Sequence, residues 1–172
     1  AAVPGEAAIE FGITGPYAIF IGGSVATLRA VWYGATLLEA HHCDRVLVLA
    51  VETFEECVDL YTRGRRLTGH PLVEAAGCLW LEPGQGTLAI ESRRGGSRPD
   101  GGGIRQRLGE AFACEPLATL DVWRRGEASA TLCLSGAWGG ETVRLWWTEP
   151  RAAVDRRPPE ATEVRGEGRH SG

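Results

Sequence analysis

Residues Gly15 to Leu38 read GPYAIFIGGSVATLRAVWYGATLL, and this stretch decides the predicted fold. A short apolar strand is predicted over Tyr17 to Ile21. Two glycines follow it, and a helix is predicted from Ser24 to Ala40, where apolar residues recur at helical spacing. The chain therefore passes from a strand through a small-residue turn into a helix whose first residue is a serine.

Ser24 is a candidate catalytic nucleophile because of this position. A helix N-terminus presents unpaired backbone N–H groups and a partial positive charge, and both stabilise an oxyanion. Gly22 and Gly23, directly before the serine, are then predicted to lie against the substrate. Serine is also a preferred N-cap residue, so a purely structural role for Ser24 stays open.

The next segments predict a mixed, mainly parallel sheet covered by helices. Arg45 to Val51 is a continuous aliphatic run, typical of a strand buried in a parallel sheet, and Glu52 to Thr62 is predicted to form a second helix. Leu72 to Leu81 and Thr87 to Ser92 flank a turn with proline and glycine, which indicates an antiparallel hairpin. We therefore expect an α/β fold.

The remaining sequence is predicted to form a smaller β-rich block. Its expected elements are a helix over Ile104 to Ala113 and strands over Leu117 to Trp123, Ala128 to Leu134 and Thr142 to Thr148. Four regions result: an α/β core over 1–93, a glycine-rich loop or linker over 94–103, an extension packed on the core over 104–148, and a flexible tail over 149–172. Trp138, Trp146 and Trp147 are candidates for a partner surface or for the core.

Three segments carry a resemblance to a known family. They are Gly15-Pro16 with Ser24 and Leu28, then CDRVLVLA over residues 43–50, then PLVEAAGCLWLE over residues 71–82. In this order they resemble the active-site segment and later strands of β-ketoacyl synthases, a family of the thiolase superfamily, over roughly residues 10 to 93. The resemblance implies a shortened, thiolase-like half-fold in which Ser24 stands where the family has its cysteine nucleophile.

The chain departs from that family in its catalytic residues. Ketosynthases use two histidines from a later part of the chain, and neither His41, His42, His70 nor His170 matches them. A serine without a base is a weak nucleophile at neutral pH. The resemblance thus implies an accessory subunit of a bacterial fatty-acid or polyketide-type pathway, non-condensing or of the chain-length type. A serine acyltransferase that carries an acyl group on Ser24 is the alternative.

Partners also follow from the resemblance. The strand before the nucleophile pairs across a twofold axis in this family, so Tyr17 to Ile21 is expected to form a dimer edge. The other copy is either this chain or a full-length ketosynthase, and an acyl carrier protein is a further expected partner. Gly22-Gly23-Ser24-Val25-Ala26 also approximates the G-x-S-x-G elbow of serine esterases, which keeps a hydrolase among the alternatives.

Composition limits the other classes of function. The 172 residues fit one domain, and a net charge of −4 with no basic stripe argues against a nucleic-acid partner. The chain has no lysine, which excludes a Schiff-base lysine and the lysine of a P-loop.

No apolar stretch reaches the roughly 18 residues of a membrane span, and no signal peptide is visible, so a cytoplasmic location is expected. Because it opens with Ala1, the chain is expected to begin after the true start.

The five cysteines predict neither a disulfide framework nor a metal site. They are widely spaced, without a C-x-x-C pair, and occur in apolar segments; they are Cys43, Cys57, Cys78, Cys114 and Cys133. We expect reduced, buried thiols, of which Cys78 is the plainest case. His41 and His42 precede Cys43, but no second ligand pair follows at zinc spacing, so neither a metal nor another cofactor is expected.

Overall fold

The computed structural model describes residues 2–54, 59, 62–63, 66, 68–84, 86–95, 103–126 and 131–148. The helices are α1 (Ala2–Glu10), α2 (Gly23–Glu39), α4 (Ile104–Leu108), the 3-10 turn η1 (Phe112–Cys114) and α5 (Glu115–Arg125). The strands are β1 (Val46–Glu52), β2 (Ala75–Leu81), β3 (Thr87–Arg94), β4 (Thr131–Trp138) and β5 (Glu141–Thr148).

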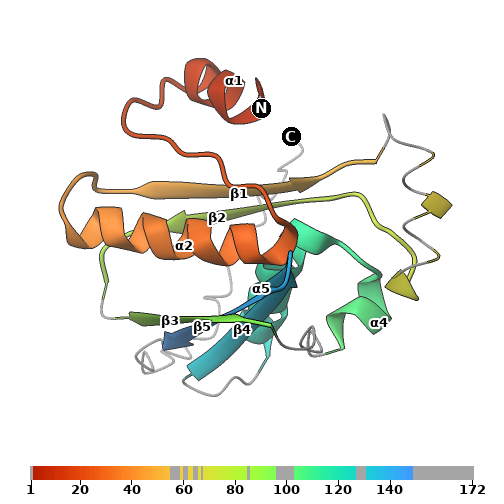
Figure 1. The fold of residues 1–172 in the computed structure, drawn as a ribbon. Coiled ribbons are helices and arrows are strands. Elements are labelled where there is room, and N and C mark those ends of the chain that lie inside the picture. Colours follow the sequence, from red (N-terminus) through yellow and green to blue (C-terminus); the bar gives the residue numbers. More distant parts are fainter. Residues whose placement is uncertain are drawn as a thin grey trace, which may run out of the picture.

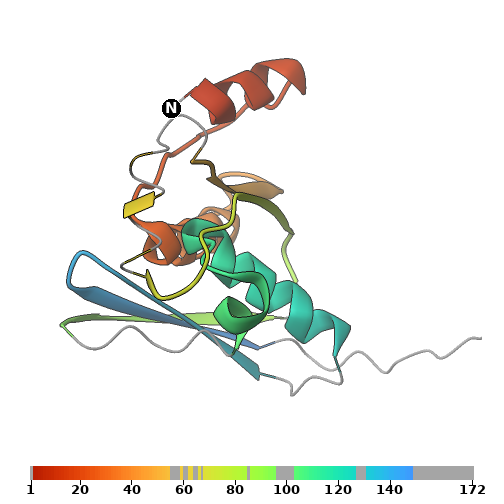
Figure 2. The same ribbon diagram turned by 90° about the vertical axis from the view of Figure 1, so that its right-hand side faces the viewer.

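Two small antiparallel sheets enclose a layer of helices. β1 pairs with β2 in the first sheet, and β5 lies between β3 and β4 in the second. Helices α2 and α5 lie between the two sheets, and α1 lies on the other side of β1 from α2 (Figures 1 and 2). The first sheet thus has one face on the helix layer and one face toward the N-terminal segment.

The core forms where α2 meets the second sheet. Leu28 and Val31 are one helical turn apart and fully buried, and they belong to one cluster with Leu134, Val143 and Leu145 of β4 and β5. Burial of each such side chain stabilises the fold by about 1.5–3 kcal/mol. The cluster joins residues from the first and the last strands, so the two sheets share one core.

Two expectations about the helices are confirmed. The helix predicted over Ser24 to Ala40 is α2, displaced by one residue at each end. Within the described residues, no helix has both the length and the apolar character that crossing a bilayer requires.

The predicted mixed, mainly parallel sheet covered by helices is wrong, and so is the thiolase-like half-fold that the resemblance implied. β1 and β2 run antiparallel, with Val46 opposite Leu81, and both sheets are small and antiparallel throughout. The predicted hairpin of β2 with β3 is wrong too, because β3 pairs with β5 in the other sheet. The aliphatic run of β1 suggested a strand buried on both faces, whereas Leu49 and Val51 of its outer face are exposed.

Two further predicted strands have a different structure. Leu117 to Trp123 belongs to helix α5, which begins with Glu115 and Pro116 and ends at Arg125. An acidic residue and a proline in the first turn and arginines in the last turn favour a helix. These end signals outweigh the strand preference of the β-branched and aromatic residues between them. Tyr17 to Ile21 is not part of a strand; it is extended chain outside both sheets.

The other elements of the C-terminal block are close to expectation. The helix predicted from residue 104 is shorter, because α4 ends at Leu108, Gly109 follows it, and η1 begins at Phe112. The last two predicted strands are β4 and β5. Residues 128–130, most of the predicted loop at 96–102, most of the second helix after Phe54 and the predicted tail over 149–172 lie outside the described residues.

Candidate functional site

Ser24 lies at the start of α2, and it is buried. Its side chain is 2% exposed, and its hydroxyl has no hydrogen-bond partner in the described part of the chain. The helix begins at Gly23 and no side chain caps it, so the alternative of Ser24 as the N-cap is wrong. β4 covers the serine so closely that a Cβ built on Gly136 would lie 2.5 Å from Ser24 Oγ.

The two glycines before Ser24 face an indole ring. A Cβ built on Gly22 would lie 3.1 Å from Trp138 Cδ1, and one on Gly23 would lie 2.8 Å from Trp138 Cε3. Trp138 also meets the ring of Phe112 edge to face, at 6.2 Å between centroids. In this conformation the turn packs on Trp138, and the Ser24 side chain is buried.

The described histidines do not form a catalytic group with Ser24. His41 and His42 follow the end of α2, the helix at whose other end Ser24 lies, and both are exposed. His70 precedes β2, and His170 lies outside the described residues. Among described residues no group of three or more histidine, cysteine or acidic side chains has the arrangement to hold a metal ion.

The predicted partner segment is strongly exposed and apolar. Tyr17 is 75% exposed and Ile21 94% exposed, while Phe20 contacts the ring of Tyr33 on α2 at 5.8 Å between centroids. Within the described residues, no backbone hydrogen bond joins residues 14–21 to another backbone group. The segment therefore combines uncovered apolar side chains with an unpaired backbone, which is the chemistry of a strand that lacks its neighbour.

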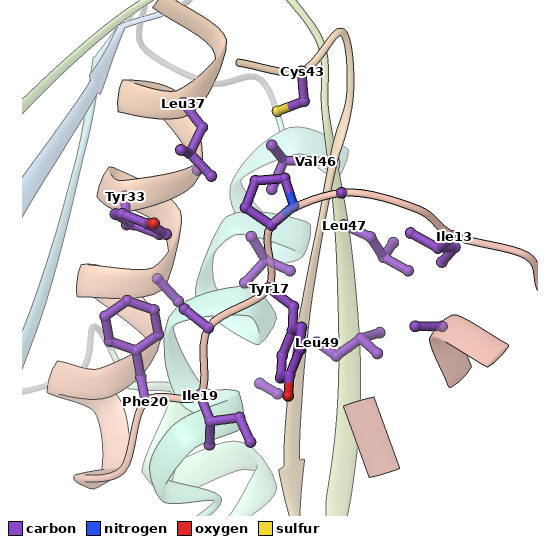
Figure 3. A pocket seen from close by; sticks show the side chains of 18 of the residues that line it. Ile13, Tyr17, Ile19, Phe20, Tyr33, Leu37, Cys43, Val46, Leu47 and Leu49 are labelled. Atoms are coloured by element: carbon purple, nitrogen blue, oxygen red, sulfur yellow. The ribbon is translucent and has the colours of Figure 1, made fainter. Parts of the chain in front are cut away.

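An apolar slot separates this segment from the first sheet. The cavity has a volume of about 340 Å³, and its walls are residues 13–20, the adjoining face of α2 and residues 45–51 at β1. Figure 3 shows the segment passing between α2 and β1, with Phe20 near Tyr33 on the helix side and Leu47 and Leu49 on the strand side. Ser24 does not line this slot.

The three tryptophans named in the sequence analysis divide between surface and core. Trp147 is buried in the core, Trp146 is half-buried, and Trp138 is half-exposed over the start of α2. Trp138 therefore covers the glycine turn that precedes Ser24.

A buried charged cluster, which no sequence motif predicted, lies beside η1. Arg105 makes a two-pronged ion pair with Glu115, with Nη2 2.8 Å from Oε1 and Nε 3.0 Å from Oε2. The carboxylate of Glu110, which is fully buried, lies 3.7 Å from Arg105 Nε and accepts a hydrogen bond from the Phe112 N–H. The pairing orders the chain between α4 and α5.

Glu52 extends this cluster from the end of β1. Its Oε1 accepts a hydrogen bond from the Ala113 N–H at 2.9 Å. Burial raises the pKa of the Glu52 carboxyl, the Ala113 N–H lowers it less, and the charge of Glu110 raises it further. The folded protein therefore holds a proton on Glu52 more tightly than the unfolded chain does.

The raised pKa of Glu52 leads to a testable prediction about Glu52→Gln. The protonated form of Glu52 stabilises the wild type below the usual carboxyl pKa, and this stabilisation is lost as pH rises through the raised pKa of the folded protein. Glutamine keeps the oxygen that accepts the hydrogen bond from the Ala113 N–H, and it does not ionise. We expect the variant to gain stability over the wild type at neutral pH and to lose that advantage in acid. Urea unfolding at both pH values measures this, with the surface variant Glu39→Gln as control; equal differences at both pH values would contradict it.

The described cysteines have different surroundings. Cys78 and Cys133 are exposed and Cys43 is half-buried, so the prediction of buried thiols is wrong for Cys78 and Cys133. Cys78 lies on the outer face of β2, which the aliphatic sequence around it suggested was inward. Cys114 is buried and donates to the carbonyl oxygens of Ala50 and Ala75, and Cys57 lies outside the described residues.

Alkylation rates are expected to follow this difference in burial. Burial, with a smaller contribution from the Glu52 charge, raises the pKa of the Cys114 thiol, and the thiolate is the reactive form. In native protein at mildly alkaline pH, iodoacetamide should modify Cys78 at least about ten-fold faster than Cys114. Peptide mapping of a time course measures both rates, and denatured protein gives the reference. Equal native rates would show that η1 opens readily.

A comparison of the chain with family models, with curated proteins and with solved structures finds no match.

Proposed function

We propose that this protein is a non-condensing accessory subunit of a fatty-acid or polyketide-type pathway, and that it binds a full-length ketosynthase through Tyr17 to Ile21. The class of pathway rests on the sequence resemblance around Ser24 and in the two later segments. One observation carries the binding role: this segment is apolar and exposed, and its backbone is unpaired within the described residues. Segments of this kind bind partners by strand pairing.

The surroundings of Ser24 support a role without covalent chemistry. Acyl transfer needs a hydroxyl that the donor can reach and a base that takes its proton. Ser24 is buried against Gly136 and its hydroxyl has no described hydrogen-bond partner, so neither condition is met in this conformation. An acyltransferase or esterase would require β4 to move away from α2.

Co-expression with full-length ketosynthases tests the binding role. A complex of defined stoichiometry is expected by size exclusion and native mass spectrometry, and Tyr17→Asp should abolish it, because a charge would be buried where an aromatic ring packs. Val122→Asp is the matched control, since Val122 is an exposed apolar residue on α5, away from the segment. Absence of a complex with every ketosynthase tried would overturn the proposal.

Intact mass separates this role from the acyltransferase alternative. After incubation with acyl-CoA and acyl-carrier thioesters, we expect no added mass on the wild type or on Ser24→Ala. The substitution removes a buried hydroxyl without a described partner, so the free energy of unfolding should be unchanged or slightly higher. An acyl adduct on the wild type that Ser24→Ala lacks would instead make Ser24 an acyl acceptor.

A further inference from the structure

We infer that the slot between residues 13–20 and β1 binds an extended, apolar β-strand of a partner protein, which pairs with the open edge of β1. The inference deepens the proposed function, and it rests on that function for the role of this surface in protein binding.

The order of the lining residues shows which part of β1 the slot meets. Successive side chains of a strand point to opposite faces of the sheet, so a cavity against one face is lined by every second residue. Here all residues from Arg45 to Val51 line the cavity. The slot therefore runs along the edge of β1, with Val48 and Ala50 on the inner side of that edge and Leu47 and Leu49 on the outer side.

This edge has open hydrogen-bonding positions. In the described sheet β1 pairs with β2 alone, so its other edge offers N–H and C=O groups to a further strand. The facing wall, residues 14–20, also has no backbone hydrogen bond to other described backbone groups. The slot is thus bordered by polar backbone on two sides and by apolar side chains elsewhere, including Leu37 of α2.

These two kinds of wall decide the class of ligand. A hydrocarbon chain would satisfy the apolar side chains but would cover backbone donors and acceptors without pairing them, which costs free energy. An extended peptide satisfies both, because its backbone pairs with β1 and its side chains point alternately to the inner and outer sides. Both sides are apolar here, so the partner strand carries aliphatic residues on both of its faces.

The charge of the lining residues further limits which partner strands can bind. Arg45 is the one charged side chain among the described lining residues, and it lies just before the first residue of β1. Its guanidinium is exposed, 3.3 Å from Glu82 and over the Trp80 ring. Because Glu82 already pairs with Arg45, this charge only disfavours a partner strand flanked by basic residues.

A labelled synthetic peptide tests the inference directly. The probe is a short valine- and isoleucine-rich strand flanked by aspartates, and the matched control has the same sequence with successive backbone amides N-methylated, so that neither of its edges can donate hydrogen bonds. Fluorescence anisotropy should show saturable binding of the first peptide. The affinity of the second peptide should be lower by a factor of about ten or more, because it lacks several N–H donors. Hydrogen exchange at β1 should slow when the first peptide binds.

Variants of the slot locate the binding. Leu49→Lys and Ile19→Lys, from opposite walls, should each weaken peptide binding about ten-fold or more by placing a charge in an apolar contact. Val122→Lys is the control, because Val122 is 39% exposed against 40% for Leu49 and lies outside the slot. Circular dichroism confirms that each variant is folded.

The outcomes separate this inference from the proposed function. Equal binding of the methylated peptide, or displacement of the peptide by palmitate, would overturn the inference in favour of a hydrocarbon site. Absence of peptide binding while the ketosynthase complex still forms would overturn the strand inference and leave the accessory role standing. Peptide binding in the slot without any ketosynthase complex would support the strand site and overturn the proposed function.

Discussion

Replacing Arg105 with methionine is expected to destabilise the protein by about 3–5 kcal/mol, because the substitution removes a buried cation from two buried carboxylates. Glu115 loses both prongs of its ion pair, and Glu110 loses a positive charge 3.7 Å away. Chemical unfolding at neutral pH measures the loss. A change below about 0.5 kcal/mol, the usual range for a surface substitution, would contradict the role assigned to Arg105.

Two further variants separate charge from geometry in this cluster. Arg105→Lys keeps the positive charge but lacks the planar fork that matches the Glu115 carboxylate, so its loss should be smaller than that of Arg105→Met. The double variant Arg105→Met with Glu115→Gln removes the carboxylate charge as well, and it should recover part of the loss. Arg125→Met is the control, because the ion pair of Arg125 with Asp121 is exposed.

The sequence correctly predicted the elements in which the end signals and the hydrophobic periodicity favour the same structure. α2 was predicted within one residue at each end, because a glycine turn precedes a long helical repeat of apolar residues. α5 was missed, because Thr119, Val122 and Trp123 favour a strand, whereas Pro116 and the arginines at its end favour a helix. Local preference alone did not decide between the two patterns.

Strand pairing was beyond the reach of the sequence. β1 and β2 were both predicted as strands, but nothing in their residues showed that they pair with each other or that β3 joins β5. The same limit applies to Tyr17 to Ile21, which has the composition of a strand and no strand neighbour in the described structure. Pairing depends on which segments meet in space, and the slot exists because this segment and β1 remain apart.

The candidate site, like the fold, could be predicted only in part from the sequence. Tyr17 to Ile21 was predicted as a partner surface from the family resemblance, and its exposure is consistent with that proposal. The burial of Ser24 was not predictable, because Gly136, which packs on it, is more than a hundred positions away in the chain. The pairing of Arg105 with Glu115 was equally hidden, since arginines and glutamates are frequent throughout this sequence.

Replacing Gly136 with alanine gives the sharpest test of how α2 packs on β4. In the middle of an unobstructed strand, alanine in place of glycine gains about 0.5–1 kcal/mol of stability through chain entropy. Here the new Cβ would lie 2.5 Å from Ser24 Oγ and 3.1 Å from the Ser24 carbonyl carbon, so we expect a loss of about 1–3 kcal/mol from overpacking. The sign of the change therefore reports the contact, and chemical unfolding measures it.

A double-mutant cycle assigns the loss to Ser24. Ser24→Gly removes the two closest atoms, Oγ and Cβ, so Gly136→Ala should cost less in that background than in the wild type. Gly126→Ala is the control, because its Cβ would meet only ordinary contacts of 3.6 Å. If Gly136→Ala instead stabilises the protein, β4 does not seal the start of α2 in solution. The Ser24 hydroxyl would then be within reach of an acyl donor, and the case for a non-covalent accessory role would lose its structural support.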